Sequence, residues 1–250
     1  MRNLNASVGA RLLAACLPCF AVFSTEPARA QTLQDSLELC RGETDTVAKR
    51  IAACTRAIAG APDDAVRAEA YLVRGVLHET AGEREAAVAD YSAVIKIDEN
   101  NALAYFNRGN AYDELGQPDL AIADYTTAIK LDPTDPDVFN NRGQVYDSRG
   151  EHDLAIADYT EAIRLDASNP LPFYNRGLSY ANKGEFARAI QEFDVAIGLS
   201  PEDADLRVAR GAANEEMGNH AAARADFRKA LEIDSGNEDA QEGLSRLGAN

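Results

Sequence analysis

The sequence is short of positive charge, and this deficit limits the partners that it can have. Its 250 residues hold 25 Lys and Arg against 41 Asp and Glu, which gives a formal net charge of −16. Nucleic-acid binding needs basic surfaces that displace phosphate counterions. Docking on anionic lipid needs clusters of Lys or Arg. The composition therefore argues against both kinds of partner.

The residue patterns of common active sites are also missing. The three His residues are scattered, and none stands in a metal-ligand spacing such as H-E-x-x-H. There is no P-loop, no G-x-G-x-x-G and no G-x-S-x-G. The segment 132–137 (DPTDPD) lacks the glycine and the terminal Glu of a calcium loop. We therefore expect no enzymatic activity, no metal site and no cofactor.

Near the N-terminus, the apolar run at 12–23 (LLAACLPCFAVF) has 12 residues, which is too short to span a bilayer. Arg2 and Arg11 precede it, and Ala28-Arg29-Ala30 supplies a small-x-small cleavage pattern. These features predict a secretory signal peptide over residues 1–30, cleaved after Ala30. A membrane anchor is the alternative. A lipoprotein box ending at Cys16 is disfavoured, because Arg11 leaves almost no apolar stretch ahead of it.

Cysteine is scarce, and two of the four cysteines lie within the expected signal peptide. Cys40 and Cys54 remain, and an exported chain meets an oxidising compartment, so we expect a disulfide between them. Two buried free thiols are the alternative. Without a nearby His, two thiols cannot fill a tetrahedral zinc site. We expect a periplasmic location, or else full secretion, and no membrane insertion of the mature chain, whose formal charge would be −18.

The sequence is rich in self-similarity, with a period of 34 residues. The segments FNRGN (106–110), NNRGQ (140–144) and YNRGL (174–178) repeat in register. Glycine, alanine and aromatic residues keep the same interval through five units. Their columns are Gly75, Gly109, Gly143, Gly177, Gly211; Gly82, Gly116, Gly150, Gly184, Gly218; Ala87, Ala121, Ala155, Ala189, Ala223; and Tyr91, Tyr125, Tyr159, Phe193, Phe227.

Each unit is predicted to form two helices. In the unit 102–135, apolar residues at helical spacing continue to Leu115, and Gly116 permits a left-handed turn there. A second amphipathic helix is expected over 120–131, before Asp132-Pro133 ends it. A single unit cannot bury its apolar face, so the units must stack.

These signatures closely resemble the tetratricopeptide repeat (TPR) family, and the chain is identified as an exported bacterial member. The resemblance implies an all-α fold, a right-handed α-solenoid of stacked helix–turn–helix units. It covers five repeats, at 68–101, 102–135, 136–169, 170–203 and 204–237. Residues 31–67 are expected to form a degenerate N-terminal helix pair, and residues 238–250 a C-terminal capping helix.

An arginine column is followed 16 residues later by an acidic column. The arginines are Arg74, Arg108, Arg142, Arg176 and Arg210, and the acids are Asp90, Asp124, Asp158, Glu192 and Asp226. We expect a ladder of Arg–carboxylate pairs, which on an exposed surface contribute about 0–1 kcal/mol each.

Asparagine occupies one register position in the three central repeats, as Asn107, Asn141 and Asn175. The resemblance places this part of the first helix in a concave groove. An amide there could meet an extended peptide backbone about every third residue. Alternatively, these asparagines are only polar surface. Other groove candidates are Phe106, Asn110, Asn140, Gln144 and Tyr174.

The expected function is that of a protein-interaction scaffold of the cell envelope, which binds an extended segment of a partner in its groove. Chaperone-binding members of the family clamp a carboxylate with Lys and Arg, and the corresponding places here hold Asn, aromatic or apolar residues. A neutral or basic segment therefore fits better, and an acidic border supports this: Glu79, Asp113, Glu114, Asp147, Glu215 and Glu216. Alternatives are a self-assembling solenoid and a chaperone-like holder of clients. The pattern leaves open whether the chain is a monomer or a homo-oligomer.

Overall fold

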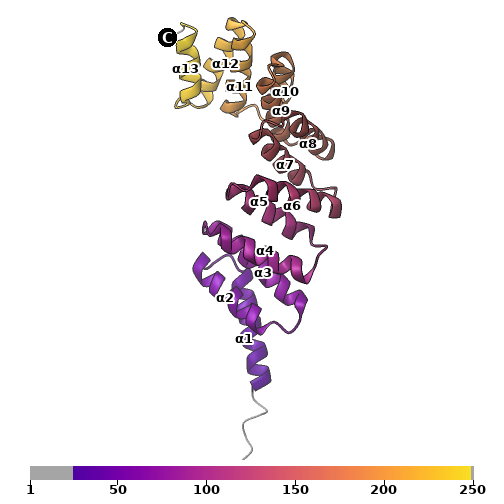
Figure 1. The fold of residues 1–250 in the computed structure, drawn as a ribbon. Helices are drawn as coiled ribbons and strands as arrows, with labels where there is room; N and C mark the ends of the chain where they lie inside the picture. The colour runs from indigo at the N-terminus through magenta and orange to yellow at the C-terminus, as the bar shows by residue number, and fades with distance from the viewer. Residues whose placement is uncertain (1–24, 249–250) are drawn as a thin grey trace, which may run out of the picture.

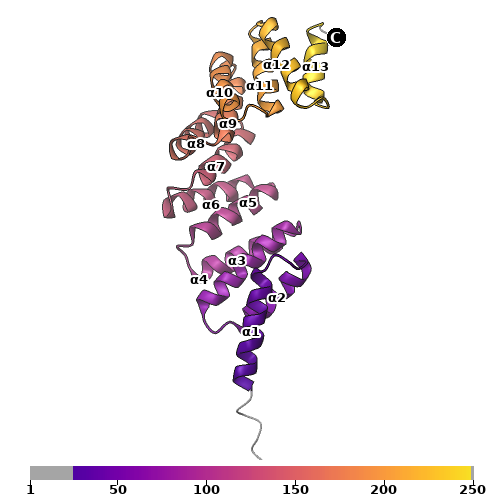
Figure 2. The same ribbon diagram turned by 180° about the vertical axis from the view of Figure 1, so that it is seen from behind.

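A computed structural model describes residues 25–248, and within that range the chain is an elongated, curved array of thirteen α-helices without β-strands (Figures 1 and 2). Helix α1 lies at one end and the C-terminus at the other. Most of the expected signal peptide lies outside the described residues. Helix α1 begins at Thr25, so the expected cleavage site after Ala30 lies within this helix. Cleavage there remains a prediction.

The helices alternate with short turns along the whole array. Their bounds are α1 Thr25–Arg41, α2 Val47–Gly60, α3 Asp64–Thr80, α4 Arg84–Ile97, α5 Ala102–Glu114, α6 Pro118–Leu131, α7 Pro136–Ser148, α8 His152–Leu165, α9 Pro170–Asn182, α10 Phe186–Leu199, α11 Ala204–Glu216, α12 His220–Ile233 and α13 Glu238–Arg246.

Each predicted repeat contributes one helix pair, from α3/α4 to α11/α12, and each pair packs on the next. The first repeat differs at its start. Helix α3 has 17 residues, whereas α5 has 13, because α3 begins at Asp64 rather than at residue 68. The Asp63 side chain caps it by accepting a hydrogen bond from the Val66 N–H.

The turn inside each repeat uses the left-handed glycine that the sequence predicts. Gly116 has a φ of +67°, and the Gln117 N–H donates to the Tyr112 carbonyl at 2.9 Å. This is a Schellman ending, in which a residue without Cβ reverses the chain and satisfies a free carbonyl at the helix end. The second helix, α6, then begins at Pro118.

The core is a strip between the paired helices, built from small residues facing aromatic rings. A Cβ added to Gly109 would lie 2.7 Å from Cε1 of Tyr125, well inside van der Waals contact. The equivalent glycines of the other four repeats approach their own ring as closely. At the C-terminal end, Gly243 of α13 packs against the Phe227 ring and closes the strip. Helix α13, Glu238–Arg246, lies within the range over which a capping helix is expected.

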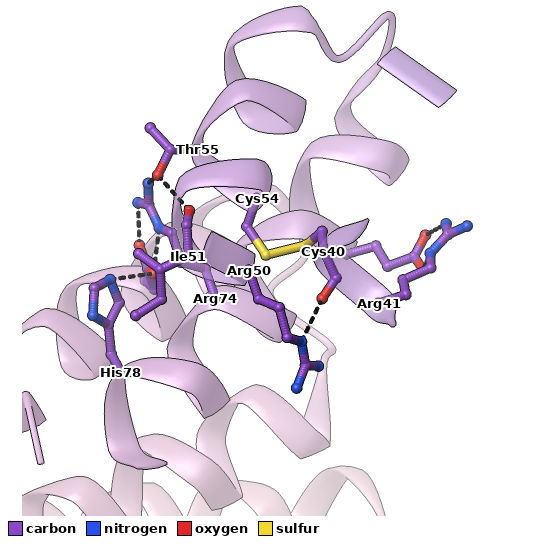
Figure 3. The surroundings of a disulfide bond; sticks show 10 residues. Cys40, Arg41, Arg50, Ile51, Cys54, Thr55, Arg74 and His78 are labelled. Atoms are coloured by element: carbon purple, nitrogen blue, oxygen red, sulfur yellow. Dashed lines mark hydrogen bonds and ion pairs between the residues drawn. A yellow bond between two sulfur atoms is a disulfide. The ribbon is translucent and has the colours of Figure 1, made fainter. Parts of the chain in front are cut away.

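At the N-terminal end, Cys40 of α1 and Cys54 of α2 form the expected disulfide, with Cα atoms 4.8 Å apart (Figure 3). Both cysteines are buried, and they share a core cluster with Ala53 and Leu77. The bond therefore links α1 to α2, and the packing of Leu77 in the same cluster joins this pair to α3 of the first full repeat.

Candidate peptide-binding groove

The arginine ladder fixes the first helix of each repeat. Arg142 donates from Nε and Nη2 to the two carboxylate oxygens of Asp158, at 2.8 and 2.7 Å. The other four predicted pairs also form. They are not the exposed pairs that the sequence suggested, because Asp158 is only 6 % exposed and three of the other acids are equally buried. Breaking such a pair leaves a buried charge, so its loss costs more than about 1 kcal/mol.

Each arginine also reaches the preceding repeat. Arg142 Nη1 donates to the Thr126 hydroxyl of α6 at 3.0 Å. Equivalent bonds run from Arg108 to Ser92 and from Arg176 to Thr160. The first helix of a repeat is therefore held to its own second helix and to the one before it, which fixes the surface that successive first helices present together.

The asparagines of the central repeats form a connected network. The Asn110 side-chain oxygen accepts from the Tyr125 hydroxyl at 2.7 Å and from Asn141 Nδ2 at 3.0 Å. Asn140 donates to Asn141 at 3.3 Å, and Asn175 donates to the Asn140 oxygen at 3.0 Å. Asn140 and Asn175 are 4 % and 7 % exposed. These two amides therefore hydrogen-bond inside the protein and do not face solvent.

The remaining candidates divide into two groups. Phe106 and Tyr174 are half-buried, and their rings lean against the core rings of Tyr125 and Phe193. Asn107, Asn110, Asn141 and Gln144 line two neighbouring cavities.

The first cavity, the apolar pocket, has a volume of about 320 Å³. Its lining is Leu72, Val73, Val76, Leu77 and Thr80 of α3, Leu103 and Asn107 of α5, and Arg41 and Arg50. Val76 and Leu103 are 44 % and 51 % exposed, which is high for large aliphatic residues. Arg50 donates from Nε to the Cys40 carbonyl at 3.3 Å, so the disulfide-linked helices position it (Figure 3).

The second cavity, the acidic pocket, has a volume of about 330 Å³. It is lined by Glu79 of α3, by Asn110, Asp113 and Glu114 of α5, by Tyr125 of α6, and by Asn141 and Gln144 of α7. Burial, together with the negative charge of Glu114, raises the pKa of both Glu79 and Asp113. The structure thus gathers three of the six predicted border acids around one cavity.

Further along the array, the carboxylate of Asp147 already has hydrogen-bond partners within the protein. It accepts from the Ser179 hydroxyl at 2.6 Å and the Tyr159 hydroxyl at 3.2 Å, and it lies 2.8 Å from His152 Nδ1. Ser179 thus bonds to a carboxylate, whereas an activated serine nucleophile bonds to a base such as imidazole.

Two further properties of residues 25–248 concern metal binding and membrane insertion. Residues 25–248 contain no group of three or more His, Cys, Asp or Glu arranged to hold a metal ion. No helix in that same range has the length and hydropathy needed to cross a bilayer.

Arg41 and Arg50 are two charged groove residues that the sequence did not indicate. They belong to the degenerate N-terminal pair, which lies outside the 34-residue register, so no column of repeats marks them.

Comparison with known proteins agrees with this architecture. Family models described as tetratricopeptide repeat match residues 102–135, 124–157 and 174–238, and one described as TPR repeat matches 80–116 and 146–184. Together the matches run without a gap from residue 80 to residue 238. No curated protein sequence matches the chain significantly.

Several solved structures share the fold. The crystal structure of MamA is 28 % identical, with a TM-score of 0.62, over 64 % of this chain and 94 % of its own. YrrB, described as a TPR protein with an unusual peptide-binding site, is 23 % identical with a TM-score of 0.64, over 77 % of this chain and 97 % of its own. A chain of the APC/C hetero-tetramer Cut9–Hcn1 is 18 % identical with a TM-score of 0.67, over 89 % of this chain and 43 % of its own. The sequence matches and the repeated helix pairs agree, and the chain belongs to the tetratricopeptide repeat family.

Proposed function

We propose that this protein is an interaction scaffold of the cell envelope, which holds an extended segment of a partner protein across its first helices. The observation that carries the proposal is the pair of neighbouring open cavities along α3, α5 and α7. Solenoids of this class bind partners on such continuous surfaces. YrrB, with the same fold, is described as having a peptide-binding site.

The envelope location rests on two features of the N-terminal region. Residues 1–30 have the pattern of a secretory signal peptide. The Cys40–Cys54 disulfide belongs to an oxidising compartment such as the periplasm. The chain's formal charge of −16 favours a neutral or basic partner segment over an acidic one.

Site-specific photo-crosslinking in the native host tests the proposal. A photoreactive phenylalanine analogue replaces Asn107 or Gln144 in the groove, or the exposed Gln191 on α10 as the matched control. We expect one discrete protein adduct from both groove positions and none from position 191.

Two outcomes would contradict the scaffold. Adducts between copies of this chain alone would favour the self-assembling solenoid. A broad smear of adducts from the groove would favour a chaperone-like holder of many clients.

A further inference from the structure

Resting on the proposed function, we propose that the groove selects a two-residue pattern in its partner. An aliphatic side chain enters the apolar pocket, and a Lys or Arg side chain two residues away, on the same face of the extended segment, enters the acidic pocket.

The argument for a cation begins with carboxylates in equivalent positions. Glu79, Asp113, Asp147 and Glu215 occupy the same place in the first, second, third and fifth repeats. Asp147 accepts the hydrogen bonds described above, and Glu215 pairs with Arg246 at 3.0 Å. Glu79 and Asp113 form no ion pair within residues 25–248, and both line the acidic pocket. Two carboxylates without a cation therefore meet in one cavity.

A buried hydroxyl beside this cavity is also incomplete. Tyr91 is fully buried, and its hydroxyl is directed at Glu79 but has no hydrogen-bond partner of ordinary geometry. In the next repeats the equivalent hydroxyls bond to Asn110 and to Asp147. A cation in the pocket can draw on one Glu79 oxygen while Tyr91 donates to the other. Tyr91 does not line the cavity, so it can hold one oxygen of Glu79 and leave the other for a cation.

The third acid of the pocket is already compensated. Glu114 pairs with Arg84 of α4 at 2.5 Å. The cation requirement therefore falls on Glu79 and Asp113. The Gln144 amide adds an acceptor oxygen at the same cavity, whereas the Asn110 oxygen is already occupied by Tyr125 and Asn141.

The apolar pocket has the opposite preference. Its aliphatic walls match Leu, Ile, Val or Met, and burying such a side chain contributes roughly 1.5–3 kcal/mol. Arg50 lies at its edge and would repel a second cation. Each pocket thus rejects the side chain that the other accepts, which fixes which side chain enters which pocket.

Helix α5 sets the spacing. Asn107 faces the apolar pocket and Asn110 the acidic one. Three residues of an α-helix rise about 4.5 Å, and alternate side chains of an extended peptide lie on one face about 6.6 Å apart, so the two side chains are two residues apart. The Asn107 amide has no partner within the described residues and is free to bond the peptide backbone between them.

Fluorescence anisotropy with the mature chain, residues 31–250, tests this pattern. The probe is a fluorescein-labelled decapeptide, Gly-Ser-Gly-Leu-Ser-Lys-Gly-Ser-Gly-Ser. Three relatives replace its Lys by norleucine, its Lys by Glu, or its Leu by Ser. We expect the Leu/Lys peptide to bind most tightly, with each replacement raising Kd about tenfold or more.

Protein variants assign the two preferences. E79Q or D113N should weaken the Leu/Lys peptide about five- to tenfold and leave the norleucine peptide unchanged. V76S should weaken every peptide that contains Leu. The matched control is E216Q, an exposed acid that occupies the position of Glu114 in the last repeat, and it should change nothing.

Equal affinities for the four peptides, or no binding by any, would overturn the two-pocket pattern. Crosslinking from position 107 would still decide the groove function by itself. If crosslinking gives a discrete partner but the four peptides bind equally or not at all, only this inference is refuted. If both experiments fail, the groove is not a partner-binding site either.

Discussion

Breaking the central arginine pair should test how the array is stabilised. The change is R142M, which keeps the aliphatic stem and removes the guanidinium. Asp158 is then left 6 % exposed without its two charge-assisted hydrogen bonds. Removing one partner of a buried pair costs about 3–5 kcal/mol. We expect about 3 kcal/mol, the lower end of that range, because the Arg142 side chain keeps 16 % exposure and water partly screens the pair.

Two companion variants separate charge burial from the loss of any arginine. R164M removes a residue whose pair with Glu161 is exposed, with side-chain exposures of 63 % and 45 %, so it should cost at most about 0.5 kcal/mol. The double variant R142M/D158L removes both buried charges and should recover most of the stability that R142M loses. A double-mutant cycle then isolates the coupling between the two residues.

The sequence contains no Trp, so urea unfolding is followed by far-ultraviolet circular dichroism rather than by tryptophan fluorescence. Repeat arrays need not unfold in two states, so amide hydrogen exchange of α7 and α8 gives the local free energy as well. If R142M costs no more free energy of unfolding than R164M, or if the double variant is as unstable as R142M, the buried pairs do not stabilise the array.

Three further outcomes follow from the same contacts. Replacing Cys40 and Cys54 by Ser should destabilise α1 and α2 by about 3 kcal/mol, because a disulfide closing a loop of this size restricts the unfolded chain; hydrogen exchange should rise there and stay unchanged in α9–α12. G143A should lower the melting temperature, because its Cβ would lie 2.7 Å from the Tyr159 ring, and the net cost should be about 1–2 kcal/mol after the gain in helix propensity. Binding of the Leu/Lys peptide should weaken as pH falls. The two unpaired acids of the acidic pocket have raised pKa values, so they take up protons above the usual carboxylate range. The same raised pKa values make the folded state bind more protons than the unfolded one, so these acids favour folding as pH falls. Measuring the Kd of the peptide and the free energy of unfolding over the same pH range therefore separates the effect on binding from the effect on stability.

The repeat register predicts some contacts and misses others, for a geometric reason. Contacts within one repeat recur at fixed offsets, and the Arg–carboxylate pairs at 16 residues are therefore visible as two columns. The amide network does not follow the columns. Asn175 bonds to Asn140, 35 residues away, and Asn141 bonds to Asn110, 31 residues away. A comparison at the 34-residue interval pairs neither of them.

Burial is a second property that the repeat columns do not predict. The sequence placed Asn107, Asn141 and Asn175 in one column, yet Asn107 lines a cavity and Asn175 is buried. Their surroundings differ because the neighbouring residues differ. Asn140 stands beside Asn141 and accepts from Asn175, whereas Phe106 stands beside Asn107 and packs against Tyr125 instead.

The hydrogen bond from each arginine to the preceding repeat bears on how a chain of this kind can gain or lose whole repeats. Arg74 reaches Thr55 across 19 residues, although its counterparts span 16, so the bond survives the extra residues that follow the degenerate pair (Figure 3). Removing residues 136–169 would join α6 to α9 and set Arg176 beside Thr126, where Arg142 now lies. Whole repeats can therefore be lost or duplicated while the same joint re-forms. The amide network would re-form only in part, because Asn175 would replace Asn141 but Tyr174 would replace Asn140, so a change in repeat number would alter the binding surface and leave the scaffold intact.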